Sequence, residues 1–262
     1  MPLDVEAYLS RIGYQGPDEP SPQTLRELQL AHLRSVPFEN LSIHSDEPIV
    51  LNDADLFEKV VKRRRGGFCY ELNGLFAALL RSLGFKVEML AAAVARSTGE
   101  YGDEFDHMTL LVTLDEPWIA DVGFGDSFLE PLLLDEEGEQ TQGSRAYKFV
   151  QEGDHRVLLQ RNFDGTWAPQ YRFTLTPHVY ADYEEMCVRQ QTSPESHFTK
   201  GRICTRATAT GRITLSELRL ITTLNAGERS EENLADEDAY SAALRDHFGI
   251  VMTKKFREVS GK

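Results

Sequence analysis

The sequence has few cysteines, no long apolar run and no excess of positive charge. Three cysteines in 262 residues are too few and too widely spaced for a disulfide framework, which indicates a reducing compartment. No apolar run reaches the roughly 18 residues that cross a bilayer, and the first residues lack the basic and then apolar pattern of a secretion signal. We therefore expect a cytoplasmic protein with no membrane partner.

The charge balance argues against a nucleic-acid-binding protein, and the spacing of the Cys and His residues argues against a metal site. Lys and Arg number 28 against 42 Asp and Glu, a formal net charge of −14. A negative field repels phosphate backbones, so no nucleic-acid partner is expected. Cys-x-x-Cys is absent, and no two of the seven histidines lie three or four residues apart, so we expect no metal site. The 41% hydrophobic content is that of an ordinary globular chain.

Helical periodicity dominates the first third of the chain. The clearest helix precedes Gly84, where six apolar residues recur at i, i+3, i+4, i+7, i+8 and i+11: Leu72, Leu75, Phe76, Leu79, Leu80 and Leu83. Earlier helices are expected over residues 5–12, after the Ser21-Pro22 cap, and from about Asp53. The sequence therefore predicts a helical region over residues 1–84.

From Phe85 the apolar period changes from about 3.6 to 2, which marks the beginning of a β region. Turn sequences separate the expected strands, which cover residues 107–114, 118–124, 147–151, 156–161 and 171–175. Short strands at this spacing predict an antiparallel barrel or sandwich over residues 85–190. Strands at 202–208 and 212–224 and a last helix before Gly249 are expected in the remaining residues, 191–262.

A cysteine stands where reactivity is expected, in residues 65–73 (RGGFCYELN). Cys69 follows two glycines and begins the clearest helix. A thiol at a helix N-terminus meets unpaired N–H groups and the positive end of the helix dipole, which lower its pKa. The glycines allow a sharp turn and close approach of a substrate. Position alone leaves two readings open, an activated nucleophile or a buried inert cysteine.

A cysteine nucleophile needs a base, and the base needs an acceptor that fixes its tautomer. His107 begins one apolar strand, and Asp121 lies within the next. His107 could also be an ordinary core histidine, and Asp121 an exposed strand acid. A three-residue turn at 115–117 puts both side chains on one face but leaves Asp121 four residues out of register, beyond hydrogen-bond reach. Residue spacing alone therefore does not complete a triad.

The sequence resembles the arylamine N-acetyltransferase family. The resemblance rests on four segments in order, residues 36–41 (VPFENL), residues 65–73, His107 before an apolar strand, and residues 121–125 (DVGFG). Residues 196–199 and 211–215 extend it over nearly the whole chain. It implies an α+β fold with an N-terminal helical bundle, a central antiparallel β-barrel and a C-terminal α/β lid, with the triad arranged as in papain-like and transglutaminase-like enzymes.

The resemblance also implies roles for individual residues. Cys69 would accept the acetyl group, His107 would act as base and then acid, and Asp121 would orient His107. Glu39 and Arg65 would form a structural pair.

The implied activity is an acyltransferase reaction that moves acetyl from acetyl-coenzyme A to arylamines or arylhydrazines by a ping-pong mechanism through acetyl-cysteine. Phe38, Phe68, Phe124 and Gly125 would bind the aromatic substrate, although each phenylalanine could equally be core packing.

Two alternatives remain open from the sequence. The same triad would serve transglutaminase-like or peptidase-like amide chemistry, since the order Cys, His, Asp does not separate these reactions from acetyl transfer. The chain could also be an inactive coenzyme A-binding homologue that keeps the fold.

Overall fold

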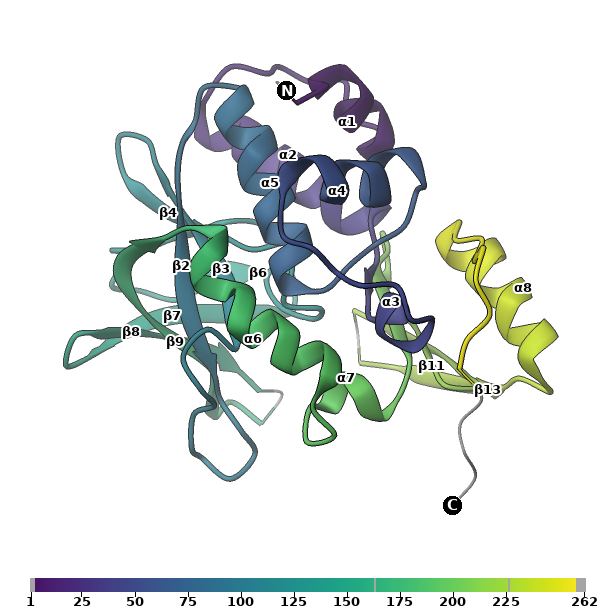
Figure 1. Cartoon of the computed structure of the whole chain (residues 1–262). Helices are drawn as coiled ribbons and strands as arrows, with labels where there is room; N and C mark the ends of the chain where they lie inside the picture. Colours follow the sequence, from purple (N-terminus) through teal and green to yellow (C-terminus); the bar gives the residue numbers. More distant parts are fainter. Residues whose placement is uncertain (1–2, 163, 226, 258–262) are drawn as a thin grey trace.

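The helical pattern of the first third produces a bundle around one central helix. The computed structural model describes residues 3–162, 164–225 and 227–257. The bundle consists of α1 (Val5–Ile12), α2 (Pro22–Ser35), α3 (Leu41–His44), α4 (Asp53–Phe57), the π-helical turn η1 (Glu58–Lys62) and α5 (Cys69–Ser82). Twelve of the fourteen residues of α5 are buried, so this helix forms the centre of the bundle (Figure 1). The expected helix at residues 72–83 is confirmed.

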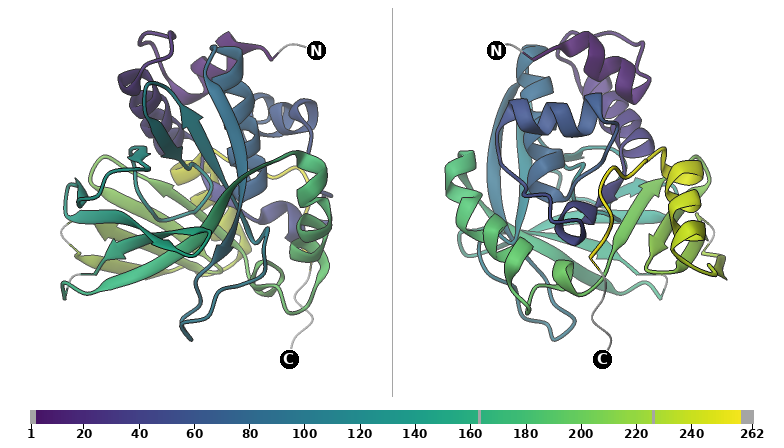
Figure 2. Two further views of the ribbon diagram at one scale, coloured as in Figure 1. Left: turned by 90° about the vertical axis from the view of Figure 1, so that its left-hand side faces the viewer. Right: turned by 45° about the vertical axis from the view of Figure 1, so that its right-hand side comes forward.

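The β region forms one antiparallel sheet in the order β5-β4-β3-β2-β9-β8-β7-β6 (Figure 2). Its strands are β2 (Lys86–Val94), β3 (His107–Thr113), β4 (Pro117–Ala120), β5 (Leu132–Leu133), β6 (Gln140–Gln142), β7 (Arg145–Glu152), β8 (His155–Arg161) and β9 (Trp167–His178). Side-chain amides join the two edges, because Gln140 hydrogen-bonds both backbone groups of Leu133 and Gln142 bonds the carbonyl of Glu130. The sheet is therefore a nearly closed barrel, and the expected α+β class with a central antiparallel barrel is confirmed.

A second sheet includes a strand from the bundle. Its order is β1-β10-β11-β12-β13, with β1 (Phe38–Glu39), β10 (Ile203–Ala207), β11 (Gly211–Ser216), β12 (Arg219–Leu224) and β13 (Arg229–Asn233). Phe38 pairs with Thr205, which ties the early chain to the C-terminal sheet. The single strand expected at 212–224 is two strands, because the chain turns at Glu217 with φ of 48°.

Three helices complete the chain: α6 (Tyr180–Thr192), α7 (His197–Lys200) and α8 (Glu237–Phe248). Helix α6 was not predicted from the sequence. The division expected after residue 190 falls inside this helix, whose last residue is Thr192. α6 runs along one side of the molecule between the barrel and α7 (Figure 1).

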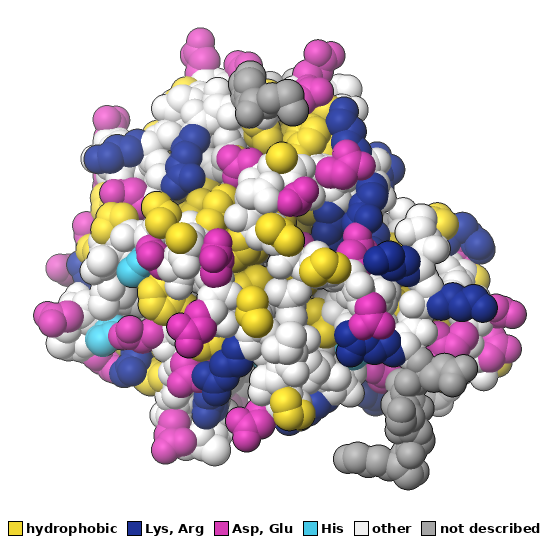
Figure 3. Space-filling view, in the orientation of Figure 1, with side chains coloured by type: hydrophobic (Ala, Val, Ile, Leu, Met, Phe, Trp, Pro, Cys, Tyr) yellow, Lys and Arg dark blue, Asp and Glu magenta, His cyan; other side chains and the backbone are white. Residues whose placement is uncertain are grey.

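The surface carries no single acidic patch on the face drawn in Figure 3, where acidic side chains are scattered among basic and neutral ones. Across the described ranges, no helix is both long enough and apolar enough to cross a membrane.

Candidate active site

The double glycine is required by a close approach of two backbone segments. A Cβ on Gly66 would lie 1.9 Å from the carbonyl oxygen of Pro37. The next residue pairs with the same segment, since the N–H of Glu39 donates to the Gly67 carbonyl at 2.8 Å. Gly66 therefore packs against the Pro37 backbone and Gly67 pairs with Glu39 of β1, and these contacts fix where α5 begins at Cys69.

Buried charged residues hold this segment in place. Glu39 and Arg65 are both almost fully buried, and their Oε1 and Nη2 atoms lie 2.7 Å apart. The second oxygen of Glu39 accepts the Leu41 N–H at 2.6 Å. Burial opposes ionisation of Glu39, but the nearby cations Arg65 and Lys59 outweigh it and lower its pKa. The expected Glu39–Arg65 contact is thus present.

A second buried pair supports the first turn of α5. Glu71 accepts the Phe68 N–H at 3.1 Å and the Lys59 ammonium at 2.6 Å. The carboxylate therefore satisfies one of the free N–H groups at the helix start. Burial raises the pKa of Glu71, and Lys59 opposes that rise.

His107 and Asp121 meet directly. His107 is the first residue of β3, Asp121 follows the last residue of β4, and their Nε2 and Oδ2 atoms lie 2.6 Å apart. The expected register is wrong, because Thr113 pairs with Pro117, and the turn consists of residues 114–116. By this register Asp121 is offset from His107 by two residues, not four, a diagonal separation that long side chains reach.

Four donors surround the Asp121 carboxylate. Oδ1 accepts from Asn73 Nδ2 at 2.8 Å and from the Gly123 N–H at 2.9 Å. Oδ2 accepts from the Tyr171 hydroxyl at 3.2 Å and faces His107 Nε2. A carboxylate in this setting is buried but fully satisfied. Asn73 and Tyr171 were not predicted from the sequence as partners of the site.

Asn73 also draws the Asp121 loop onto α5. Its side-chain oxygen accepts the Val122 N–H at 2.8 Å. A Cβ on Gly123 would lie 2.8 Å from the Cys69 Cα, so only glycine lets the loop come this close. Asn73 and Gly123 therefore place Asp121 near Cys69. Asn73 stands four residues after Cys69 on the same helix face, a signal that sequence reasoning could have used.

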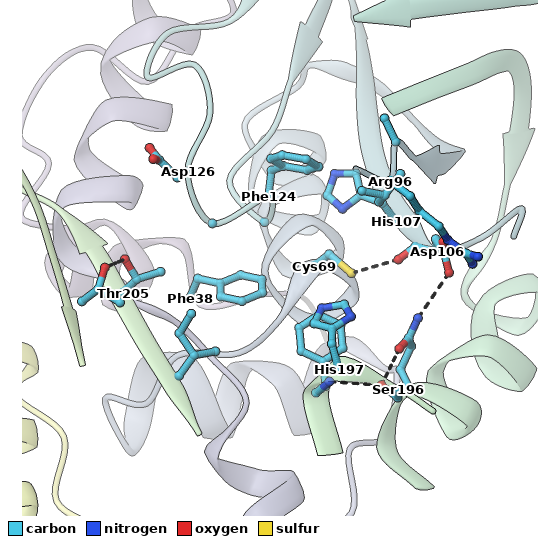
Figure 4. Close-up of a pocket in the computed structure, with 18 of the residues that line it drawn as sticks. Phe38, Cys69, Arg96, Asp106, His107, Phe124, Asp126, Ser196, His197 and Thr205 are labelled. Atoms are coloured by element: carbon cyan, nitrogen blue, oxygen red, sulfur yellow. Dashed lines mark hydrogen bonds between the residues drawn. The ribbon is translucent and has the colours of Figure 1, made fainter. Parts of the chain in front are cut away.

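A cavity of about 1000 Å³ opens onto these residues. Cys69, His107, Phe38, Phe124 and Gly125 all line it, and Figure 4 shows the cysteine sulfur and the histidine ring facing the same space. The Cys69 thiol donates to the Asp106 carbonyl at 3.9 Å.

Phe68, which was expected in the cavity wall, is absent from it. Its side chain is fully buried, with edge contacts to Tyr70 and Phe198 at ring-centre distances of 5.0 and 5.4 Å. The Phe68 side chain packs in the core because the backbone at this position starts α5. Phe68 therefore lies in the core of this structure, outside the residues that line the cavity.

Burial opposes the ionisation of the Cys69 thiol that its position at a helix N-terminus predicts. It raises the pKa of the thiol well above its usual value, and Cys187 and Asp121 add to the rise, while the N–H groups of Met108 and Tyr70 oppose it. The helix N-terminus thus does not by itself produce a thiolate here. A thiolate at Cys69 needs a positive partner, and His107 lines the same cavity.

The turn that leads into His107 is held by α6. Arg189 Nη1 lies 2.6 Å from Asp103 Oδ2, and Gln190 Nε2 donates to Asp106 Oδ1 at 3.3 Å. Burial and the neighbouring Asp103 raise the pKa of Asp106. No local sequence pattern indicates the role of these α6 residues, because the partners of Arg189 and Gln190 lie 86 and 84 residues away.

Phe105 in the same turn has a left-handed backbone, with φ of 66°. Such a conformation is uncommon for a bulky residue and needs support from its surroundings. The Tyr70 hydroxyl donates to the Phe105 carbonyl at 2.5 Å, and the Phe105 ring packs 5.2 Å from the Tyr183 ring. These contacts fix the backbone two residues before His107.

Over residues 3–162, 164–225 and 227–257, no group of three or more His, Cys, Asp or Glu side chains is arranged to hold a metal ion.

Comparison with known proteins gives consistent matches over most of the chain. A family model described as N-acetyltransferase matches residues 22–257. The arylamine N-acetyltransferase of Escherichia coli (strain K12) is 36% identical over 246 residues, which cover 93% of this chain and 87% of that protein.

Solved structures agree in fold as well as in sequence. The arylamine N-acetyltransferase of Salmonella typhimurium matches with a TM-score of 0.88 and 33% identity, over 94% of this chain and 90% of that one. The Mycobacterium marinum arylamine N-acetyltransferase in complex with CoA matches with a TM-score of 0.87 and 32% identity, over 94% and 93% of the two chains.

Proposed function

The chain belongs to the arylamine N-acetyltransferase family, and from this premise we propose that Cys69, His107 and Asp121 are its catalytic triad. The protein is an acyltransferase that takes acetyl from acetyl-coenzyme A. The observation that carries the residue assignment is the contact between His107 Nε2 and Asp121 Oδ2 at 2.6 Å, beside a cavity that Cys69 also lines.

Proton transfer to His107 activates the nucleophile. Nε2 of His107 faces Asp121, so Nδ1 is the nitrogen left to accept the Cys69 proton. The thiolate then forms beside an imidazolium, whose charge the Asp121 carboxylate balances. This pairing overcomes the effect of burial, which alone raises the pKa of Cys69.

Acetyl transfer follows in two halves. The Cys69 sulfur attacks the thioester carbonyl, a new C–S bond forms, the bond to the coenzyme sulfur breaks, and His107 returns its proton to the departing thiolate. The amine nitrogen then attacks acetyl-Cys69, gives its proton to His107, and releases the Cys69 thiolate. Because one thioester replaces another in the first half, the protein contributes mainly orientation and exclusion of water.

The cavity has the groups that a coenzyme with phosphates requires. Arg96, Arg212 and Arg229 lie in its wall, as do the hydroxyl residues Thr205 and Thr214 of β10 and β11. Within the described ranges Arg96 forms no ion pair, whereas Arg212 pairs with an acidic residue of the wall. We assign phosphate contacts to these arginines of the cavity lining.

We assign the aromatic acceptor to the apolar part of the cavity beside Cys69 and His107. The Phe124 ring stands edge-on to His107 at a ring-centre distance of 5.1 Å, and Phe38 lies across from it (Figure 4). Gly125 leaves the face of Phe38 open. Phe38, Phe124 and Gly125 would therefore hold a small arylamine or arylhydrazine near acetyl-Cys69.

We keep two further assignments as proposals. The chain is divided into a bundle (1–84), a barrel (85–190) and a lid (191–262), with the triad between the first two. The protein acts in the cytoplasm, in keeping with three cysteines that are all unpaired.

Intact mass spectrometry tests the assignment. Mixing the protein with acetyl-coenzyme A should add one acetyl group, about 42 Da, and release one thiol. Cys69→Ala should abolish the adduct, and Cys187→Ala, a change at another buried cysteine, should leave it intact. An adduct that persists in Cys69→Ala would refute the assignment. Coenzyme binding without any adduct would favour the inactive homologue, and release of amide products without acetylation would favour amide chemistry.

A further inference from the structure

A second cavity, of about 410 Å³, lies at the seam between the helical bundle and α8. Its walls come from α1, the end of α2, the loop after η1, β10 and α8, and it shares no lining residue with the active-site cavity. Figure 2 (right) shows α8 on the same side of the molecule as α1 and α2. The cavity is therefore separate from the proposed acetyl-transfer site.

Arginines dominate this second cavity. Arg11, Arg64, Arg206 and Arg245 come from four different elements, and the one acidic residue in the wall is Asp246. Asp246 is already paired with Arg245 at 2.9 Å. In the part of the chain that the structure describes, Arg11, Arg64 and Arg206 form no ion pair. Three cations thus converge without a carboxylate, in a chain whose net charge is −14.

Backbone carbonyls hold two of these cations in place. Arg11 Nη1 donates to the Ser35 carbonyl at 2.8 Å, at the end of α2. Arg206 donates to the Arg34 carbonyl at 2.8 Å and to the His247 carbonyl, near the end of α8, at 2.7 Å. The carbonyls at these helix ends hold the guanidinium groups by hydrogen bonds. Their partial negative charge does not neutralise the full positive charge of the guanidinium groups.

Donors remain after these contacts. The Nε atom of Arg206 is buried and has no partner among the described residues. The side chain of Arg64 makes no hydrogen bond within the same ranges. Burial, with Arg64 and Arg206 nearby, lowers the pKa of Arg11 to about 10. The cations therefore destabilise one another in the absence of an anion.

We propose that this cavity binds a compact dianionic oxyanion, either free phosphate or a small phosphate monoester. Guanidinium groups match phosphate oxygens in geometry and charge. The donors to the bound anion are Arg206 Nε, the guanidinium of Arg64, and the guanidinium N–H groups of Arg245 that do not face Asp246. The cavity exceeds the size of one phosphate group, so the carbon portion of a small monoester also fits. A bound anion joins α8 to the helical bundle and stabilises the folded protein.

Calorimetric titration tests the site in the full chain. The protein is first saturated with coenzyme A, so that the phosphate contacts of the active-site cavity are occupied. Inorganic phosphate and glycerol 3-phosphate are then titrated separately, with sodium chloride at equal ionic strength as reference. We expect one binding event above the chloride reference in at least one titration. The tighter of the two ligands identifies the source of the phosphoryl group.

Two exposed arginines allow variants that keep the fold. Arg64 has a φ of 53°, which asparagine tolerates, so Arg64→Asn is suitable, and Arg245→Gln removes a surface cation. Each variant should weaken phosphate binding about tenfold through loss of a charge-assisted contact. Arg161→Gln, an equal charge change on the barrel, should leave binding unchanged, and the rate of Cys69 acetylation should be unchanged in all three.

Thermal unfolding gives a second measurement. Phosphate should raise the melting temperature of the parent and of Arg161→Gln more than chloride does, and it should raise that of the double variant Arg64→Asn/Arg245→Gln no more than chloride. Absence of binding by both phosphate ligands would overturn the proposal. Binding of equal strength in the parent and in the double variant would also overturn it.

Discussion

Replacement of Asp121 by asparagine separates the proposed catalytic role of this residue from its role in packing. The carboxylate receives hydrogen bonds from Asn73 and Gly123 at Oδ1, and faces Tyr171 and His107 at Oδ2. Asparagine has nearly the same volume but carries one oxygen and one NH₂ group. The variant must therefore place a donor where one carboxylate oxygen now accepts two hydrogen bonds.

The hydrogen-bond partners of residue 121 determine the orientation of the asparagine side-chain amide. At Oδ1 an NH₂ group would face two donors that cannot become acceptors, Asn73 Nδ2 and the Gly123 N–H. The NH₂ group is thus directed to His107, whose Nε2 must then accept and whose Nδ1 carries the proton. His107 in this tautomer cannot take a proton from Cys69. The same change in a serine-protease triad lowers kcat about 10⁴-fold, and we expect a loss of that order for acetylation.

The fold should survive Asp121→Asn. Three of the four hydrogen bonds can re-form, so we expect a loss of about 1–3 kcal/mol in the free energy of unfolding. The Cys69 thiolate also loses its imidazolium partner. Because burial already raises the pKa of Cys69, the variant should be alkylated more slowly than the parent at every pH below that of full ionisation.

Two measurements are needed together: melting followed by circular dichroism, and the pH dependence of Cys69 alkylation by iodoacetamide. The control is Asp115→Asn, the same charge change in the exposed turn of the β3–β4 hairpin, which should alter neither. A folded Asp121→Asn protein with the alkylation profile of the parent would remove Asp121 from the triad.

Two further predictions concern stability. Glu39→Ala leaves Arg65 buried without its partner and should lower the free energy of unfolding by ~3–5 kcal/mol, measured by chemical denaturation; a variant as stable as the parent but without activity would point to a chemical role instead. His32 is fully buried, and burial lowers its pKa to about 3. The unfolded chain therefore binds the extra proton first, and stability should fall by up to about 1.4 kcal/mol per pH unit as pH decreases from about 6.5 towards 3. Urea unfolding at pH 7, 6 and 5 should show a smaller decrease for His32→Gln, and equal decreases would contradict the assignment.

Local sequence patterns predicted the structure correctly where a segment's own residues determine whether it forms a helix or a strand. The apolar repeat after Cys69 and the two glycines before it predict the start of α5, and the structure begins the helix at that residue. The change of period at Phe85 predicts the first barrel strand, which begins at Lys86. In both cases the signal and the structure lie within the same few residues.

The predicted β3–β4 register is wrong because the sequence does not determine which residues form the turn. Asp115, Glu116 and Pro117 all favour turns, but Pro117 is the first residue of β4, where its missing N–H costs no ladder bond. The actual turn begins at Leu114, an apolar residue with no turn preference. A shift of one position in the turn moves the pairing by two residues, which decides whether Asp121 reaches His107.

Helix α6 was missed because its buried face is narrow. Only Tyr183, Cys187 and Gln190 of its thirteen residues are buried, so the apolar stripe that predicts a helix is weak. Its polar residues contact the turn before His107 and the active-site cavity instead. The role of such a helix cannot be predicted from its own residues, because its polar side chains contact residues that are distant in the sequence.

The state of Cys69 shows how tertiary burial overrides a local electrostatic argument. A helix N-terminus contributes a stabilisation of the thiolate of about 0.3–1 kcal/mol when exposed, whereas loss of water around a buried thiol opposes ionisation more strongly. The direction of the Cys69 pKa follows the larger effect and is raised. If the thiolate forms only as a pair with imidazolium, its population depends on Asp121 through His107. The reactivity of this cysteine is then a property of three residues from two parts of the fold, and the helix that carries the sulfur supplies its position more than its charge.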